Sequence, residues 1–232
     1  MSNLDNLLFT PTVREKSGCH VTALSDQVDY ISSTSGGSVP TDLTKGDVLV
    51  YTQRGSLGVE FYFGGLRQEV EPLDEGRRFP FIAGTEYRLL TSPGSRLVQF
   101  QLNPEDPLRY EKSTDGKMGS APQRDKNNGR TIVNITPRVR AFTVHDLDNI
   151  RLGDNYHETT PQLFFVEDGK THCKLENPKN GQKVEYTIEA GQFVVVPHSI
   201  AYLLIPDPHA CFLGILGADF NPGDLRTHRI NL

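Results

Sequence analysis

Short apolar runs, separated by turn-forming residues, recur along the whole chain. The 15 prolines and 21 glycines lie between these runs and keep them short. Evenly spaced short segments of this kind predict an all-β sandwich or barrel. The main apolar segments are Asp47–Tyr51, Val59–Phe63, Leu97–Leu102, Leu163–Val166, Phe193–Val196, Tyr202–Ile205 and Cys211–Leu216.

A helical pattern, with apolar residues at every third or fourth position, is not sustained over several turns in any segment. The best helical candidates are residues 1–12 and Val144–Ile150. We therefore expect an all-β protein with little helix.

A polar, charged stretch over residues 104–130 divides the chain. It contains few residues able to form a core, so we expect a linker between an N-terminal half, residues 1–103, and a C-terminal half, residues 131–232. The halves match each other, because Gly76–Phe100 aligns without a gap with Gly191–Ile215. A glycine, an apolar strand, a tyrosine and a second strand recur in register, which indicates two copies of one unit.

Charge and cysteine content narrow the classes of partner and compartment. The chain has 24 basic and 29 acidic residues, a net charge of −5, so it lacks the basic excess typical of nucleic-acid binders. The three cysteines form neither an even set nor a CxxC pair, so we expect no disulfide framework, no cysteine-based zinc site and a reducing, cytoplasmic location. The N-terminus lacks the pattern of a secretory signal and the apolar runs are too short to span a membrane, so we expect no membrane partner.

Histidines concentrate in the C-terminal half, which holds all but one of the seven. If the two halves share a fold, the second carries the functional site. Its histidines are His145, His157, His172, His198, His209 and His228.

The segment from Asn155 to Gly169 resembles the first motif of the cupin superfamily, in which two histidines one residue apart precede a glutamate and then a glycine. Counting back from Gly169 places Gln162 at the position of the glutamate. His157 then takes the position of the second histidine and Asn155 that of the first.

The second cupin motif is similar to Gly191–Tyr202, where Tyr202 takes the position of the final histidine. The N-terminal half repeats this motif as Gly76–Tyr87, but Arg54 and Val59 stand where His157 and Gln162 stand in the other half. The resemblance implies two antiparallel cupin-type β-barrels, a bicupin, with a degenerate N-terminal barrel. Barrels of this kind often associate, so we expect a homodimer.

The resemblance also implies a metal position, which in cupins takes three imidazoles and a carboxylate. Here the matching positions hold one imidazole, two amides and a phenol, at Asn155, His157, Gln162 and Tyr202. Neutral amide oxygens add little charge and a phenol must lose a proton with a pKa of about 10, so these residues bind a first-row metal poorly. We expect neither a metal nor another cofactor.

Two further histidines could change that expectation. His172 or His198 would complete a better ligand set if it pointed inward. On a strand, His172 and Cys173 cannot both face inward, and the sequence does not settle which does.

These side chains are suited to proton transfer on a small polar ligand. His157 is the expected proton acceptor and Tyr202 the expected proton donor or oxyanion partner. We expect further contacts with the substrate from Asn155, Gln162, His172 and His198.

The spacing of His157, Gln162 and Gly169 is similar to that in sugar-nucleotide 3,4-ketoisomerases, cupins that need no metal. Asn155 departs from that family's first histidine, and the duplicated N-terminal half is not part of its usual single-domain enzyme. The leading hypothesis is a metal-independent isomerase, epimerase, lyase or cyclase, acting on a small metabolite such as a sugar nucleotide. The alternatives are a non-catalytic ligand-binding or structural bicupin and a metal-dependent oxygenase or lyase. The sequence leaves the substrate and the reaction type open.

Overall fold

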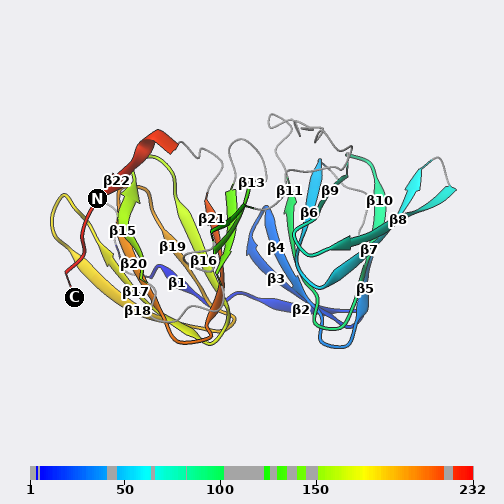
Figure 1. Ribbon diagram of the computed structural model, residues 1–232, viewed down its shortest axis with the longest axis horizontal. Coiled ribbons are helices and arrows are strands. Elements are labelled where there is room, and N and C mark those ends of the chain that lie inside the picture. The colour runs from blue at the N-terminus through cyan, green and yellow to red at the C-terminus, as the bar shows by residue number, and fades with distance from the viewer. Residues whose placement is uncertain are drawn as a thin grey trace. The chain divides into compact units, whose positions relative to one another are not determined.

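The computed structural model describes residues 4, 6–40, 46–63, 66–81, 83–101, 123–125, 130–134, 140–144, 151–216 and 222–231. In these ranges the chain forms antiparallel strands, β1 to β22, and one short 3₁₀ helix, η1 (Pro222–Asp224) (Figure 1). The all-β prediction is confirmed. No helix in the described ranges is long and apolar enough to cross a membrane.

The chain divides into two compact units: residues 12–121, the N-terminal unit, and residues 1–11 with 122–232, the C-terminal unit. The division between residues 121 and 122 falls within the predicted linker. Most of that linker lies outside the described residues, but its Gln123–Asp125 forms β12, which pairs with β13 (Arg130–Asn134). The first 11 residues differ from the prediction, because they belong with the C-terminal unit.

Two sheets form the N-terminal unit. The six-stranded sheet has the order β2 (Val13–Lys16), β3 (Cys19–Ser25), β4 (Val28–Ser32), β11 (Arg96–Gln101), β6 (Val48–Arg54) and β9 (Arg78–Phe81). The four-stranded sheet has the order β5 (Gly37–Pro40), β10 (Glu86–Thr91), β7 (Ser56–Phe63) and β8 (Leu66–Asp74). Inward-facing residues of both sheets form one apolar core, which includes Cys19, Val21, Ile31, Val39, Val48, Val50, Leu57, Val59, Phe81, Tyr87, Leu89 and Leu97.

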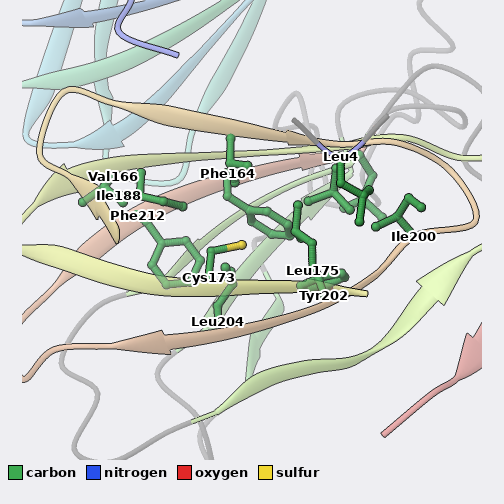
Figure 2. Close-up of a cluster of buried hydrophobic side chains, with 13 residues drawn as sticks. Leu4, Phe164, Val166, Cys173, Leu175, Ile188, Ile200, Tyr202, Leu204 and Phe212 are labelled. Carbon is green, nitrogen blue, oxygen red and sulfur yellow. The ribbon is translucent and has the colours of Figure 1, made fainter. Parts of the chain in front are cut away.

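The C-terminal unit is also built from two sheets. The seven-stranded sheet has the order β1 (Leu8–Phe9), β19 (Phe193–Val196), β16 (Gln162–Asp168), β21 (Cys211–Leu216), β14 (Arg140–Val144), β13 and β12. The five-stranded sheet has the order β18 (Lys183–Glu189), β17 (Lys170–Glu176), β20 (Ala201–Pro206), β15 (Leu152–His157) and β22 (Leu225–Thr227). Alternate residues from both sheets meet in the core shown in Figure 2, where Phe164 of β16 lies against Tyr202 of β20.

The predicted internal repeat coincides with the strands. The gap-free alignment matches β9 with β19, β10 with β20 and β11 with β21, each pair having the same number of residues. The aligned glycines Gly76 and Gly191, which precede β9 and β19, have φ angles of 84° and 85°. Only glycine adopts this left-handed conformation at little cost, so both copies keep it at the turn before the strand.

The helix expected over residues 1–12 does not form in the described part of that segment. Instead, Leu8 and Phe9 pair with Val194 and Phe193 of β19, and the amide of Val195 donates a hydrogen bond of 3.0 Å to the carbonyl of Leu7. The other helical candidate ends outside the described residues, and its first residue, Val144, ends β14. Pairing with a strand distant in sequence satisfies the backbone of the first segment better than an isolated helix would.

Candidate functional site

Asn155, His157 and Tyr202 occupy inward positions on two paired strands of the C-terminal unit. Asn155 of β15 lies opposite Tyr202 of β20 in the strand register. Directly opposed residues of an antiparallel pair project to the same face, and Tyr202 belongs to the apolar core. Side chains alternate along a strand, so His157 faces inward as well, in agreement with its exposed fraction of 6%.

Gln162 reaches the same interior from the opposite sheet. It begins β16, is 4% exposed and alternates with Phe164 and Val166, which are both core residues. All four residues that the cupin resemblance aligned with metal ligands therefore face the interior of one unit.

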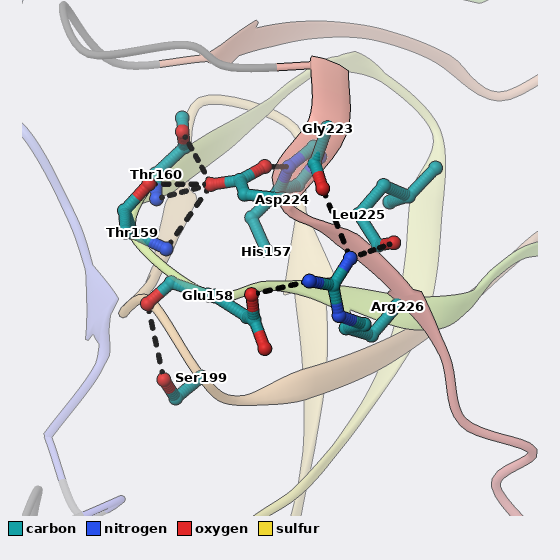
Figure 3. Close-up of polar contacts among 9 residues, drawn as sticks. All are labelled: His157, Glu158, Thr159, Thr160, Ser199, Gly223, Asp224, Leu225 and Arg226. Atoms are coloured by element: carbon teal, nitrogen blue, oxygen red, sulfur yellow. Dashed lines mark hydrogen bonds and ion pairs between the residues drawn. The ribbon is translucent and has the colours of Figure 1, made fainter.

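The side chain of His157 is paired with Asp224, a residue of η1 (Figure 3). The distance from His157 Nδ1 to Asp224 Oδ1 is 2.5 Å, and Asp224 is 3% exposed. Asp224 Oδ2 accepts hydrogen bonds from the amides of Thr159 and Thr160, at 3.1 and 3.2 Å, and from their hydroxyls, at 2.6 and 3.0 Å. A buried carboxylate is thus held by donors on one short loop.

These hydrogen bonds decide the charge of Asp224. Burial alone would raise its pKa, but hydrogen bonds from Thr159, His157 and Thr160 outweigh that effect and hold the pKa well below its usual value. Asp224 is therefore a carboxylate at neutral pH and only accepts hydrogen bonds, so His157 Nδ1 carries the donated proton. In a neutral imidazole the other nitrogen, Nε2, then has the lone pair.

Neighbouring contacts hold β22 and the loop after β15 together. Arg226 forms an ion pair of 2.7 Å with Glu158, whose amide donates a hydrogen bond of 3.1 Å to the carbonyl of Asp224. The carbonyl of His157 accepts a hydrogen bond of 2.6 Å from the amide of Ser199. Ser199 has a φ of 62°, a conformation that is uncommon outside glycine and that clusters at functional sites.

Close packing of β15 on β20 depends on Gly153. A Cβ atom at this position would lie 2.2 Å from the carbonyl oxygen of Tyr202, and the φ of Gly153 is +118°. The strand register shifts between Gly153 and Asn155, which indicates a bulge beside the site.

Tyr202 is mainly a packing residue in its surroundings. It is 8% exposed, and its ring centroid lies 4.9 Å from that of Phe164 (Figure 2). Its predicted role as proton donor or oxyanion partner stays a prediction.

His172 and His198 do not join the inward residues. His172 is exposed on β17, with Nδ1 3.1 Å from Thr187 Oγ1, whereas the adjacent Cys173 is buried in the core. His198 is exposed in the turn before β20, with Nδ1 3.4 Å from Ser199 Oγ. Cys173, and not His172, therefore faces inward on β17. The side chains of His172 and His198 lie apart from the interior, where we expected them to contact the substrate.

The inward residues do not fit a first-row metal. His157 is the one imidazole among these four inward residues, Asn155 Nδ2 donates a hydrogen bond of 2.9 Å to the carbonyl of Gly153, and Gln162 and Tyr202 offer only an amide and a phenol. Among the residues that the structure describes, no group of three or more histidine, cysteine, aspartate or glutamate side chains could hold a metal ion.

The N-terminal unit has neither an inward histidine nor an inward glutamine at the positions that match His157 and Gln162. Arg54 is exposed, while Val59 and Tyr87 are core residues. Tyr87 stacks on Phe81 with ring centroids 3.7 Å apart and donates a hydrogen bond of 3.0 Å to Gln99. The two units therefore share the arrangement of these strands but differ in the side chains that fill their interiors.

Asp224 was missed by sequence reasoning. It lies 67 residues after His157 and belongs to no motif that the sequence presents.

The two units together have the bicupin fold, with two cupin-type β-barrels in one chain. The solved structures that resemble the chain include two mutants of Bacillus subtilis oxalate decarboxylase OxdC, each with a TM-score of 0.66, at 13% and 14% sequence identity. Each match covers 98% of this chain and 80% of the other. A further structure of that enzyme, described in terms of its Mn(II) centres, matches with a TM-score of 0.65 and 13% identity over the same shares of the two chains. No protein-family model matches the sequence, and no curated protein matches it either.

Proposed function

We propose that the C-terminal unit binds a small polar metabolite and transfers a proton on it, with His157 as the proton acceptor and Asp224 as its positioning partner. The observation that carries this proposal is the buried pair of His157 and Asp224, 2.5 Å apart. The reaction class is that of an isomerase, epimerase, lyase or cyclase.

Proton transfer is the chemistry to which this pair is suited. A carboxylate on Nδ1 holds the ring in one orientation and one tautomer, and it stabilises the imidazolium that forms when Nε2 takes up a proton. The hydrogen bonds from Thr159 and Thr160 keep Asp224 charged while it is buried. Building such an arrangement around one histidine is costly, and a packing role alone does not require it.

Metal-dependent decarboxylation is not the activity we propose. The structurally similar enzyme is an oxalate decarboxylase with Mn(II) centres. At the positions that the cupin resemblance assigns to three imidazoles and a carboxylate, this chain has one imidazole, the amides of Asn155 and Gln162 and the phenol of Tyr202, so it lacks a carboxylate ligand there. We therefore propose chemistry that does not use a metal.

Solvent exchange tests the proposal even while the product is unidentified. Chelator-treated protein is incubated in D₂O with a panel of small polar metabolites that includes sugar nucleotides, and deuterium uptake at carbon is followed by mass spectrometry. We expect uptake into at least one compound, reduced by about 10²–10⁴-fold in His157→Gln. The matched control is His172→Gln, which changes an exposed histidine of the same unit and should exchange at the wild-type rate. Equal rates in the wild type and His157→Gln, or uptake only after manganese is added, would overturn the proposal.

A non-catalytic binding protein is the second candidate, and the packing of Tyr202 favours it. Both Tyr202 and its counterpart Tyr87 lie in apolar cores, as expected of structural residues. Binding of a panel compound with no deuterium uptake in any variant would favour this candidate.

We also propose that the protein is a cytoplasmic homodimer. All three cysteines are free in the structure, which suits a reducing compartment. Light scattering at several concentrations tests the oligomeric state, and a monomer at every concentration would contradict it.

A further inference from the structure

Asn155 is fixed in one orientation with a buried acceptor. Its Nδ2 donates a hydrogen bond of 2.9 Å to the carbonyl of Gly153. Its Oδ1 is buried and has no hydrogen-bond partner among the residues that the structure describes. Reversing the amide would turn two acceptors toward each other, so the contact with Gly153 leaves Oδ1 as the group that needs a partner.

A buried acceptor without a partner is uncommon and costly, so a hydrogen-bond donor on a bound ligand would be favoured at this position. Asn155 lies on the same inward face as His157, and a spacing of two residues along a strand is about 7 Å. Tyr202 lies opposite Asn155 in the register. A donor that satisfies Asn155 Oδ1 would thus lie within the length of a small molecule from the imidazole of His157.

The charges around this acceptor indicate the kind of donor. None of the strands β15, β16 and β20 contains a lysine or arginine. The ionised group paired with the neighbouring His157 is the carboxylate of Asp224, and the guanidinium of Arg226 is already paired with Glu158 at the surface. An ionised carboxylate or phosphate group has no proton to donate to an amide oxygen, and no lysine or arginine of these strands would offset its charge.

We propose that Asn155 Oδ1 accepts a hydrogen bond from a hydroxyl group of an uncharged, polyhydroxylated ligand, and that this ligand is the class of compound on which His157 acts. The second part rests on the proposed function. A hydroxyl supplies the donor without the cost of burying an ion, which favours a sugar-like group over an ammonium group. A dicarboxylate such as oxalate has no donor for this position.

Binding measurements with defined probes test the proposal. The neutral probes are D-glucose, D-galactose, D-mannose and myo-inositol, with glucosamine as the ammonium probe and oxalate as the anionic probe. Saturation-transfer NMR identifies binding and calorimetry gives the dissociation constants. We expect at least one neutral probe to bind the wild type and oxalate not to bind.

The decisive comparison uses two variants. Asn155→Leu keeps the side-chain size but removes the acceptor, and it should weaken binding of that neutral probe by about tenfold or more. Asn180→Leu is the matched control, because Asn180 is exposed in the turn between β17 and β18, and it should bind as the wild type does. Deoxy analogues of the probe, tested on the wild-type protein, give the same information if Asn155→Leu fails to fold.

The outcomes separate this inference from the proposed function. Binding of oxalate or glucosamine alone, no binding of any neutral probe, or equal binding by the wild type and Asn155→Leu would overturn the inference. If binding depends on Asn155 but His157→Gln leaves deuterium uptake unchanged, the proposed function fails and the hydroxyl-binding site stands. Loss of uptake in His157→Gln with binding independent of Asn155 gives the reverse result.

Discussion

Replacing Asp224 with alanine removes the acceptor of every hydrogen bond described around its carboxylate. His157 Nδ1 and the amides and hydroxyls of Thr159 and Thr160 then lose their hydrogen bonds to this carboxylate, and both His157 and Thr160 are buried. A buried donor left without a partner costs about 1–3 kcal/mol, and breaking a buried charged pair costs about 3–5 kcal/mol. Because hydroxyls can turn toward other acceptors, we expect the free energy of unfolding to fall by about 3–5 kcal/mol.

Urea denaturation at pH 7, followed by circular dichroism, measures this loss. The matched control is Asp207→Ala, since Asp207 forms a surface ion pair of 3.6 Å with Lys170. A surface pair of this kind is worth about 0–1 kcal/mol. A loss below about 1 kcal/mol for Asp224→Ala, or no difference from the control, would refute the reasoning.

Acid gives a second test of the same carboxylate. The pKa of Asp224 is lower in the folded protein than in the unfolded chain, so its contribution to stability is complete above the unfolded value of about 3.9 and is lost as the pH falls toward the folded value. Asp224→Asn has no such titration. The difference in unfolding free energy between the wild type and Asp224→Asn should therefore shrink as the pH falls below about pH 4. A constant difference down to about pH 3 would contradict the lowered pKa.

Further changes test other parts of the structure. Gly153→Ala should lower the unfolding free energy by more than about 2 kcal/mol in a urea titration, because its Cβ would lie 2.2 Å from the carbonyl of Tyr202; a loss below about 0.5 kcal/mol would show that the strands can separate there. Leu4→Ala should cost about 2–5 kcal/mol in thermal or urea unfolding, because Leu4 is 0% exposed in the core of the C-terminal unit, and a neutral effect would contradict that packing. Tyr202→Phe should keep the fold and reduce deuterium uptake less than His157→Gln does; an unfolded variant would make Tyr202 a structural residue only. Elemental analysis of protein purified without added metal should find less than one transition-metal ion per chain, and about one ion that survives chelation would contradict the proposed chemistry.

The repeat and the fold were predictable because they depend on local patterns. Gly76 and Gly191 lie in turns that need a positive φ. In the apolar strands that follow, successive side chains point to opposite faces of the sheet. These patterns match β9 with β19 and β10 with β20 before any tertiary contact is known. The inward placement of Tyr202 follows from the same register.

Contacts between distant parts of the chain were not predictable in this way. The carbonyl of Leu4 accepts a hydrogen bond of 2.6 Å from Tyr186, 182 residues away, and no local pattern indicates that pairing. Apolar residues near the N-terminus therefore suggested a helix. Asp224 was missed for the same reason, because an aspartate in a short turn is usually a solvated loop residue.

The orientation of His172 required the structure because the sequence pattern is ambiguous there. Residues of β17 alternate between core and solvent. One of the two possible alternations would place His172 inward, and the other would place Cys173 inward. Burial of Cys173 and Leu175 fixes the phase, so His172 faces outward.

The central claim is that Asp224 positions His157 to accept a proton through Nε2. The most direct test of this claim is to determine which ring nitrogen of His157 carries a proton. Two-bond ¹H–¹⁵N correlation spectra of the wild type and Asp224→Asn, recorded with ¹⁵N-labelled histidine, identify which ring nitrogen carries the proton. The account predicts that Nδ1 of the wild-type ring carries the proton that is hydrogen-bonded to Asp224. It predicts a proton on Nε2 in Asp224→Asn, where the amide oxygen stays with the threonine donors and the amide nitrogen faces the ring. A wild-type ring with its proton on Nε2, or the same tautomer in both proteins, would contradict it.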